Sequence, residues 1–170
     1  MIRRSVPVRG LAVGTSLLLS GFLFFAQAKT SDKAQGEKFQ AQSHFESIRK
    51  DASIVQTTAA NLEKLTRDAT TKWADYDRKW NEIKPSVEDM SMKLAEIEAM
   101  RSTLSPSEQK ALDKSMVLIK ALKTNTSEIR MQLDNSRNNL NQPLIRSFSR
   151  NMVQKSETLE KLTAKVSATS

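Results

Sequence analysis

The chain has 170 residues, of which 5% are aromatic and none is cysteine, and its formal net charge is +8. The lack of cysteine excludes a lipoprotein anchor, thiol chemistry, iron–sulfur clusters and covalently attached c-type haem. Acidic and basic residues alternate along the chain instead of forming a basic block, as on a solvated helical surface, so we expect no nucleic-acid partner.

The first 28 residues have the pattern of a cleavable secretory signal peptide. Three arginines fall within the first nine residues, an apolar run occupies residues 11–25, and residues 26–28 (AQA) match a small-x-small cleavage site. The apolar run contains two glycines and is shorter than the roughly 20 residues that span a bilayer. We therefore expect a periplasmic or secreted protein, cleaved after Ala28 and left without a stable membrane anchor.

The remainder is predicted to be a short flexible leader, residues 29–38, followed by a single helical domain, residues 39–167. Loss of three of the 27 basic residues with the signal, against 19 acidic residues, leaves a net charge of +5. Glycine and proline are scarce, no segment alternates as a strand does, and apolar residues recur at three-then-four spacing. This period predicts helices that pack against other helices in a coiled-coil-like manner.

The first apolar seam extends from Phe45 to Ile83 and is interrupted only at Thr66. Its continuity favours one long helix over residues 37–102. Such a helix would be about 100 Å long, at roughly 1.5 Å per residue.

A break inside this seam is the interpretation we favour. Residues 68–71 (DATT) include the poorest helix formers of the segment, because β-branched side chains lose rotamer freedom in a helix. Thr70 or Thr71 could cap a new helix opening at Trp73. The break gives helices of similar length over residues 37–67 and 71–102.

Three aromatic residues, Trp73, Tyr76 and Trp80, share one face of the second predicted helix. They continue the apolar seam, so we expect them in the core, with the indole and phenol tips at its rim. The alternative is an exposed aromatic platform that binds a partner, since monomers seldom expose an apolar patch of several hundred Å².

Pro85 lies inside the second predicted helix, where proline removes a hydrogen bond and kinks the axis. The seam continues beyond it, so we expect a kinked helix. The alternative is a helix that ends there and begins again with Ser86 as its cap.

The clearest helix start is a capping box formed by Ser105 and Glu108, with Pro106 at the first helical position. A last helix follows an asparagine-rich turn over residues 134–143. Its expected apolar positions are Leu144, Ile145, Phe148, Met152, Leu159, Leu162 and Val166. The predicted helices are 37–67, 71–102, 106–139 and 142–166. They predict an all-α fold, either an antiparallel four-helix bundle or an elongated helical hairpin.

Catalytic and metal-binding patterns are weak, and we predict no enzyme, cofactor or metal site. His44 is the only histidine, and no glutamate lies three residues before it, as a di-iron bundle would require. The carboxylates of Glu88-Asp89 and of Glu96 and Glu98 point in different directions on a helix. Met90 lies on the seam and Met92 does not, so core packing explains the methionines better than copper binding does.

The segment LSPSEQKALDK (residues 104–114), with Trp73, residues 94–96 (LAE) and Asn125-Thr126, resembles a pattern in small exported bacterial helical proteins of unknown function. The resemblance covers roughly residues 58–140. It implies helices on both sides of a turn near residues 68–72, and it implies no activity or site residue.

Residues 104–109 (LSPSEQ) are similar to the LTxxQ motif of periplasmic helical chaperones and metal-stress proteins of the CpxP/Spy type. Ser105 stands in place of the threonine, Gln109 comes one residue late, and one copy is present where that family carries two. The similarity implies a chaperone-like or stress-response role.

The sequence therefore predicts an exported, non-enzymatic helical protein of the cell envelope. We expect it to present a helical surface to a protein partner or to a second copy of itself. The alternative is a periplasmic chaperone-like protein that binds unfolded clients.

Overall fold

The computed structural model describes residues 21–135 and 140–168, and side chains over residues 35–135 and 140–166. Most of the predicted signal peptide therefore lies outside the described residues. The chain divides into two compact units, Met1–Ala34 and Gln35–Ser170. The first unit is helical over its described residues, and the second unit contains the bundle.

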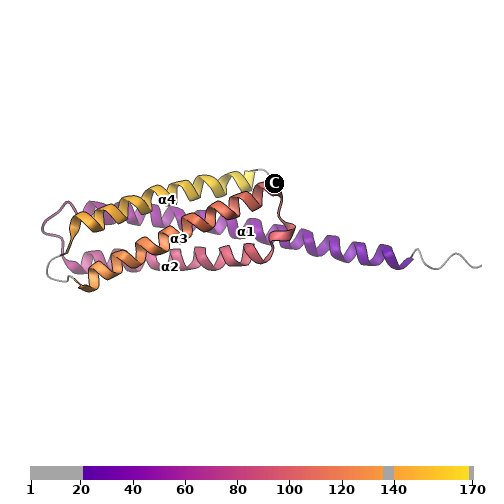
Figure 1. The fold of residues 1–170 in the computed structure, drawn as a ribbon, viewed down its shortest axis with the longest axis horizontal. Coiled ribbons are helices and arrows are strands. Elements are labelled where there is room, and N and C mark those ends of the chain that lie inside the picture. The colour runs from indigo at the N-terminus through magenta and orange to yellow at the C-terminus, as the bar shows by residue number, and fades with distance from the viewer. Residues whose placement is uncertain (1–20, 136–139, 169–170) are drawn as a thin grey trace, which may run out of the picture. The chain divides into compact units, whose positions relative to one another are not determined.

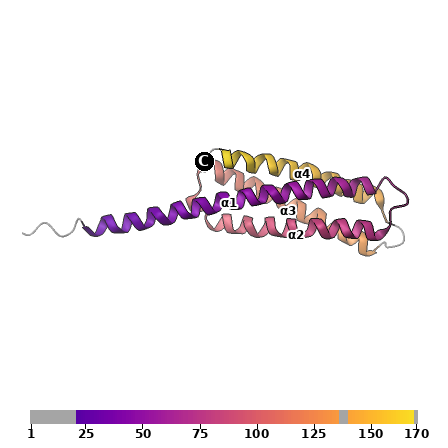
Figure 2. The ribbon, with the colours of Figure 1, turned by 180° about the vertical axis from the view of Figure 1, so that it is seen from behind.

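Four helices make up the described fold, which is all-α and confirms the predicted fold class. They are α1 (Gly21–Leu65), α2 (Trp73–Ala99), α3 (Pro106–Asn135) and α4 (Gln142–Ala168), with a short 3-10 helix η1 (Arg101–Thr103) before α3. In the second unit, α1 lies behind α3 in Figure 1 and in front of it in Figure 2, between α2 and α4. Consecutive helices are antiparallel, which makes the unit a four-helix bundle.

One seam from each helix meets in the core. Burial of these apolar side chains is the main stabilising contribution, worth roughly 25 cal/mol per Å² removed from water. The largest fully buried side chains are Tyr76, Phe45, Ile48, Leu62, Ile83, Met90, Ile97, Leu112, Ile119, Leu122, Ile129 and Leu133. These residues occupy the three-then-four positions of α1, α2 and α3, so the sequence period and the observed core agree for these helices.

The turn between α1 and α2 lies where the sequence favoured a break. Tyr76 and Thr71 both donate side-chain hydrogen bonds to the Leu65 carbonyl, at 3.0 Å each. Carbonyls at a helix C-terminus lack intrahelical partners, and these two bonds satisfy one of them. Neither Thr70 nor Thr71 caps α2, however, because Lys72 occupies the cap position.

The start of α3 has the predicted capping box. The Ser105 backbone N–H donates to Glu108 Oε2 at 2.7 Å, and the Glu108 N–H donates to Ser105 Oγ at 3.4 Å. Pro106 is the first residue of the helix. The reciprocal bonds account for the identities of these three residues through helix initiation alone.

Residues 29–38, predicted to be a flexible leader, belong to α1 in the structure. Six of its ten residues are lysine, alanine, glutamine or glutamate, which are strong helix formers, and its one glycine costs about 1 kcal/mol. Extending an existing helix adds one hydrogen bond per residue and avoids the free-energy cost of nucleating a new helix. Helix α1 therefore continues toward the N-terminus beyond its buried seam.

In α4 the predicted seam is partly wrong. Ser149, Ser156 and Thr163 are fully buried there, whereas the predicted core residues Phe148 and Leu162 are only half-buried. Hydroxyls can occupy a core where they bond to the preceding helical turn, as Ser149 does to the Ile145 carbonyl at 2.8 Å. The pattern of apolar residues alone does not reveal such positions.

Helix α2 passes through Pro85 without ending, and the proline is exposed. Pro85 has no N–H to donate to the carbonyl of Asn81, one turn earlier, so that carbonyl lacks its intrahelical partner. The exposed position leaves water as the alternative partner for this carbonyl.

We expect Pro85→Ala to raise the free energy of unfolding by about 1–2 kcal/mol. Restoring the helical hydrogen bond is worth up to ~3 kcal/mol, and the greater freedom of the unfolded chain offsets about 1 kcal/mol of it. Urea unfolding followed by circular dichroism measures the change. Glu88→Ala, at another exposed position of α2, should shift stability by less than about 0.5 kcal/mol. A destabilised Pro85→Ala protein would show that Pro85 itself contributes to helix packing.

Candidate functional site

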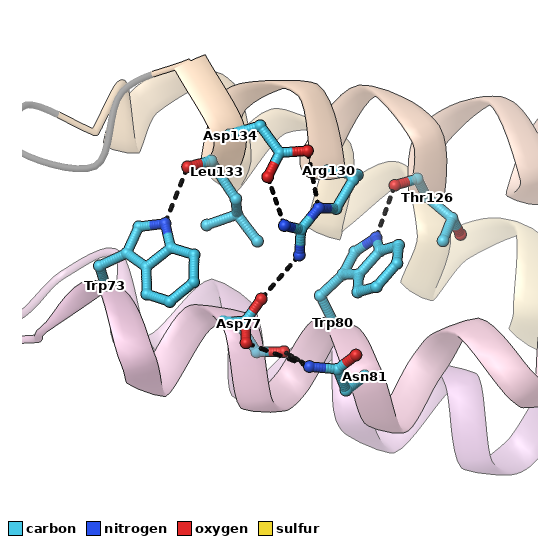
Figure 3. Close-up of polar contacts among 8 residues, drawn as sticks. All are labelled: Trp73, Asp77, Trp80, Asn81, Thr126, Arg130, Leu133 and Asp134. Carbon is cyan, nitrogen blue, oxygen red and sulfur yellow. Dashed lines mark hydrogen bonds and ion pairs between the residues drawn. The ribbon is translucent and has the colours of Figure 1, made fainter.

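The two tryptophans join α2 to α3. Trp73 Nε1 donates to the Leu133 carbonyl and Trp80 Nε1 donates to the Thr126 carbonyl, each at 2.8 Å (Figure 3). Both rings are half-buried against the core, and Tyr76 between them is fully buried. The aromatic residues thus form part of the packed seam, which is the interpretation that the sequence favoured over an exposed platform.

Arg130 of α3 lies between the two indoles (Figure 3). Its guanidinium donates to Asp77 Oδ1 of α2 at 2.7 Å and makes two hydrogen bonds to Asp134. The guanidinium carbon is also 4.9 Å from the Trp80 ring centroid, within cation–π range. Hydrogen bonds to Asp134, and then to Asp77, raise the pKa of Arg130, so it remains charged at physiological pH.

A hollow of about 230 Å³ lies beside this cluster, and Trp80, Lys84, Lys123 and Arg130 are among its lining residues. The polar tips of the tryptophans are already bound to helix carbonyls, and Arg130 is held by two carboxylates. The polar groups of the cluster are therefore bound to other groups of the same molecule, and the cluster is suited to joining α2 to α3.

A second cluster of charges lies between α1 and α2. His44 Nε2 is 3.0 Å from Glu96 Oε2, and Lys93 Nζ lies 3.5 Å from Asp51 Oδ2 and also pairs with Asp89. Burial, and then a hydrogen bond with Asp89, raises the pKa of Asp51, while the hydrogen bond from Lys93 lowers the pKa of Asp89. The two carboxylates thus differ in basicity, and Lys93 offsets the negative charge between the helices.

This cluster offers no metal centre. Over residues 35–135 and 140–166, no three histidine or carboxylate side chains come together in a way that could hold a metal ion. Glu88 and Glu98 are exposed on α2 and lie outside the cluster. Met90 is buried and Met92 is exposed, so these two methionines do not converge.

An apolar groove lies between α3 and α4. It has a volume of about 460 Å³ and is lined by Lys114, Val117, Leu118, Thr158, Lys161, Leu162 and Lys165. An adjoining hollow of about 440 Å³ shares three of these residues and adds Ser107, Lys110, Ala111 and Val166. We call the two together the lysine groove.

The lysine groove combines an apolar floor with a basic rim. Val117 is 70% exposed, and the half-buried Leu118 and Leu162 lie beside it. Lysines from α3 and from α4 line the same groove, and they are spaced four residues apart on each helix. Side chains four apart lie on one helix face, so the positive charge runs along both walls.

Sequence reasoning missed this groove because it assigned Leu162 to the core. The buried hydroxyl residue Thr163 occupies the core position, and its Oγ1 donates to the Leu159 carbonyl at 2.9 Å. Leu162 is thereby rotated to the flank that faces α3. The signal available in the sequence was Ser149, Ser156 and Thr163 at seven-residue intervals, a regular spacing that marks a helix face.

Comparison of the chain with known family models, curated proteins and solved structures gave no match. None of the helices within residues 21–135 and 140–168 has the length and hydropathy required to cross a lipid bilayer.

We expect Trp80→Ala to lower the free energy of unfolding by about 2–4 kcal/mol, through lost ring burial, the lost hydrogen bond and the lost contact with Arg130. Urea unfolding measures it. Phe39→Ala is the matched control, because Phe39 is 75% exposed and should cost less than about 0.5 kcal/mol. If Trp80→Ala lowered the free energy of unfolding no more than Phe39→Ala does, the result would contradict a packed role for the indole.

The shifted pKa values of Asp51 and Glu63 imply opposite effects of pH on the free energy of unfolding. Folding raises the pKa of Asp51 above its ordinary value of 3.8. The stability that Asp51 contributes is therefore lost as pH rises through its pKa in the folded protein. Hydrogen bonds from Arg67 and Arg150 lower the pKa of Glu63 below 4.5, so its contribution is lost as pH falls through the folded value.

Relative to the unchanged protein, Asp51→Asn should therefore become more stable as pH rises above about 4. Glu63→Gln should become relatively more stable as pH falls below about 4.5. Urea unfolding of the three proteins between pH 3 and pH 7 measures both differences. Parallel pH dependence of the two variants would show that the carboxylates do not differ in this way.

Proposed function

We propose that this protein is an exported, non-enzymatic interaction protein of the cell envelope, and that it binds a partner helix in the lysine groove. The observation that carries the proposal is an apolar floor, with Val117 70% exposed, between two rows of lysines. Exposed apolar surface with a polar rim is typical of a docking site. The mechanism is the packing of an apolar helix face into a preformed groove.

The rest of the bundle supports a binding role. The aromatic residues are committed to the α2–α3 contact, and the charged cluster between α1 and α2 is paired internally. The lysine groove differs, because its apolar floor faces solvent and Lys110 and Lys114 have no carboxylate partner among the described residues. An occupant with apolar and acidic side chains would remove this exposed surface from water.

Photo-crosslinking in the producing cell tests the proposal. A photoreactive residue at position 117 should give a discrete crosslinked product, whereas the same residue at position 131 should give at least tenfold less. Met131 is the matched control because it is an exposed apolar residue of the same helix, 45% exposed and outside the groove. The protein recovered from the envelope should begin at Lys29 if the predicted signal is cleaved.

Equal labelling at both positions, or none at position 117, would contradict the docking surface. A broad smear of products at position 117 would favour the chaperone-like alternative instead. That alternative would also require suppression of client aggregation at a near-stoichiometric ratio.

A further inference from the structure

We propose that the occupant of the lysine groove is the acidic outer face of α2 from a second copy of this chain. The inference rests on the proposed function, since it names the partner for that same groove. It makes the protein a self-associating module in which every copy carries both halves of the contact.

The acidic outer face is formed by Glu88, Met92, Ala95, Glu96 and Ala99, all of which are exposed. Met92 is 60% exposed, which is unusual for a large apolar side chain flanked by charge. The residues recur every three or four positions, so they share one side of α2, opposite the seam that packs into the core. This face therefore presents apolar side chains between carboxylates.

Charge complementarity connects this face with the groove. Helix α2 carries seven acidic and four basic residues, whereas α4 carries five basic and two acidic residues. Glu88 has a 3.7 Å contact with Lys84, a weak exposed pair within α2. Glu96 lies 3.0 Å from His44 of α1, but its side chain is 56% exposed and can still face a second copy. An acidic helix seated in the groove would place carboxylates beside Lys110 and Lys114, while Met92 would cover the apolar floor at Val117.

The two surfaces also match in length. The acidic face extends over residues 88–99 of α2, and the groove wall extends over residues 107–118 of α3. Each span is about 17 Å at roughly 1.5 Å per residue. Three turns of one helix therefore fit the groove from end to end.

The contact is heterologous, because a face of α2 meets a groove of α3 and α4. In the bundle, α2 is adjacent to α1 and α3, and it lies diagonally across from α4. The two surfaces do not overlap, so one copy can bind a neighbour at each. Such contacts build an open chain or a closed ring.

A contact of three helical turns buries less than the roughly 1,200 Å² typical of stable interfaces, so the association is weak. Its charged rim makes it sensitive to salt. Self-association should therefore be sought at high protein concentration and low ionic strength.

Charge-reversal variants test the proposed self-association. The protein is purified in the form that accumulates in the producing cell. The groove variant is Lys110→Glu with Lys114→Glu, and the face variant is Glu88→Lys with Glu96→Lys. All four side chains are exposed, although Glu96→Lys also removes the contact with His44 of α1. Circular dichroism and thermal unfolding verify that each variant keeps the fold. The matched control is Lys50→Glu with Lys64→Glu, which reverses two exposed lysines of α1.

Light scattering should show that the average mass of the unchanged protein and of the control rises with concentration and falls with salt. Each reversed variant alone should associate at least tenfold more weakly, since its face and the α3 wall of its groove then carry charge of the same sign. An equimolar mixture of the two variants should regain the association, because each groove again meets a face of opposite charge.

The proposal is overturned if the unchanged protein stays monomeric, or if the mixture does not regain what each variant lost. A monomer that binds laurate, and loses that binding in the groove variant, would assign the groove to an anionic amphiphile. A monomer that crosslinks at position 117 to a different protein would overturn self-association and leave the proposed function standing. Failure of crosslinking at position 117 would overturn both.

Discussion

The structure depends on the burial of one side-chain seam from each of four helices. Large apolar residues such as Phe45, Ile83 and Ile119 occupy the seams of α1, α2 and α3, with small residues such as Ala52 and Ser115 among them. The α4 seam alternates apolar residues with small hydroxyl residues, including Ser156 and Thr163. Small residues fill less volume and bring less apolar area to the core. The composition of this seam leaves apolar residues of α4 on its flank, where they form the floor of the groove.

Much of the fold follows from the sequence because it depends on local signals. Each of these signals acts within a few residues of the chain. They are the period of the apolar seam, the capping residues Ser105 and Glu108, and the poor helix formers of residues 68–71. The observed helix limits follow these signals closely except at the start of α1, which begins at Gly21 and not at the predicted residue 37. The identity of the α2 cap was missed because Lys72 has no capping side chain of the usual kind. The start of α2 is supported by Asp75, whose carboxylate accepts from the Lys72 N–H at 3.4 Å, and by the tertiary bonds of Trp73 and Tyr76.

The candidate site was less predictable, because it depends on contacts between helices. Whether Leu162 or Thr163 faces the core is a rotation of about 100° on one helix, and both choices fit a broad apolar stripe. The pairing of Arg130 with Asp77, 53 residues apart in the chain, has no local signature either. A sequence pattern shows which residues can share a face, whereas the partner of that face is decided by the packing of the whole bundle.

Polar contacts hold both ends of the bundle. At the end that holds the α1–α2 turn, Arg146 binds the Thr66 carbonyl at 2.6 Å, and Trp73 and Tyr76 bind carbonyls of α3 and α1. The lysine groove is at the opposite end, where α3 begins and α4 finishes. At this end Arg101, just before α3, donates to Asp113 of α3 at 2.6 Å, and Gln109 Nε2 donates to the Arg101 carbonyl at 3.2 Å. These bonds hold the start of α3 against the turn that follows α2. The α3 wall of the groove is therefore fixed before any helix binds, which lowers the cost of ordering that a partner would otherwise have to offset.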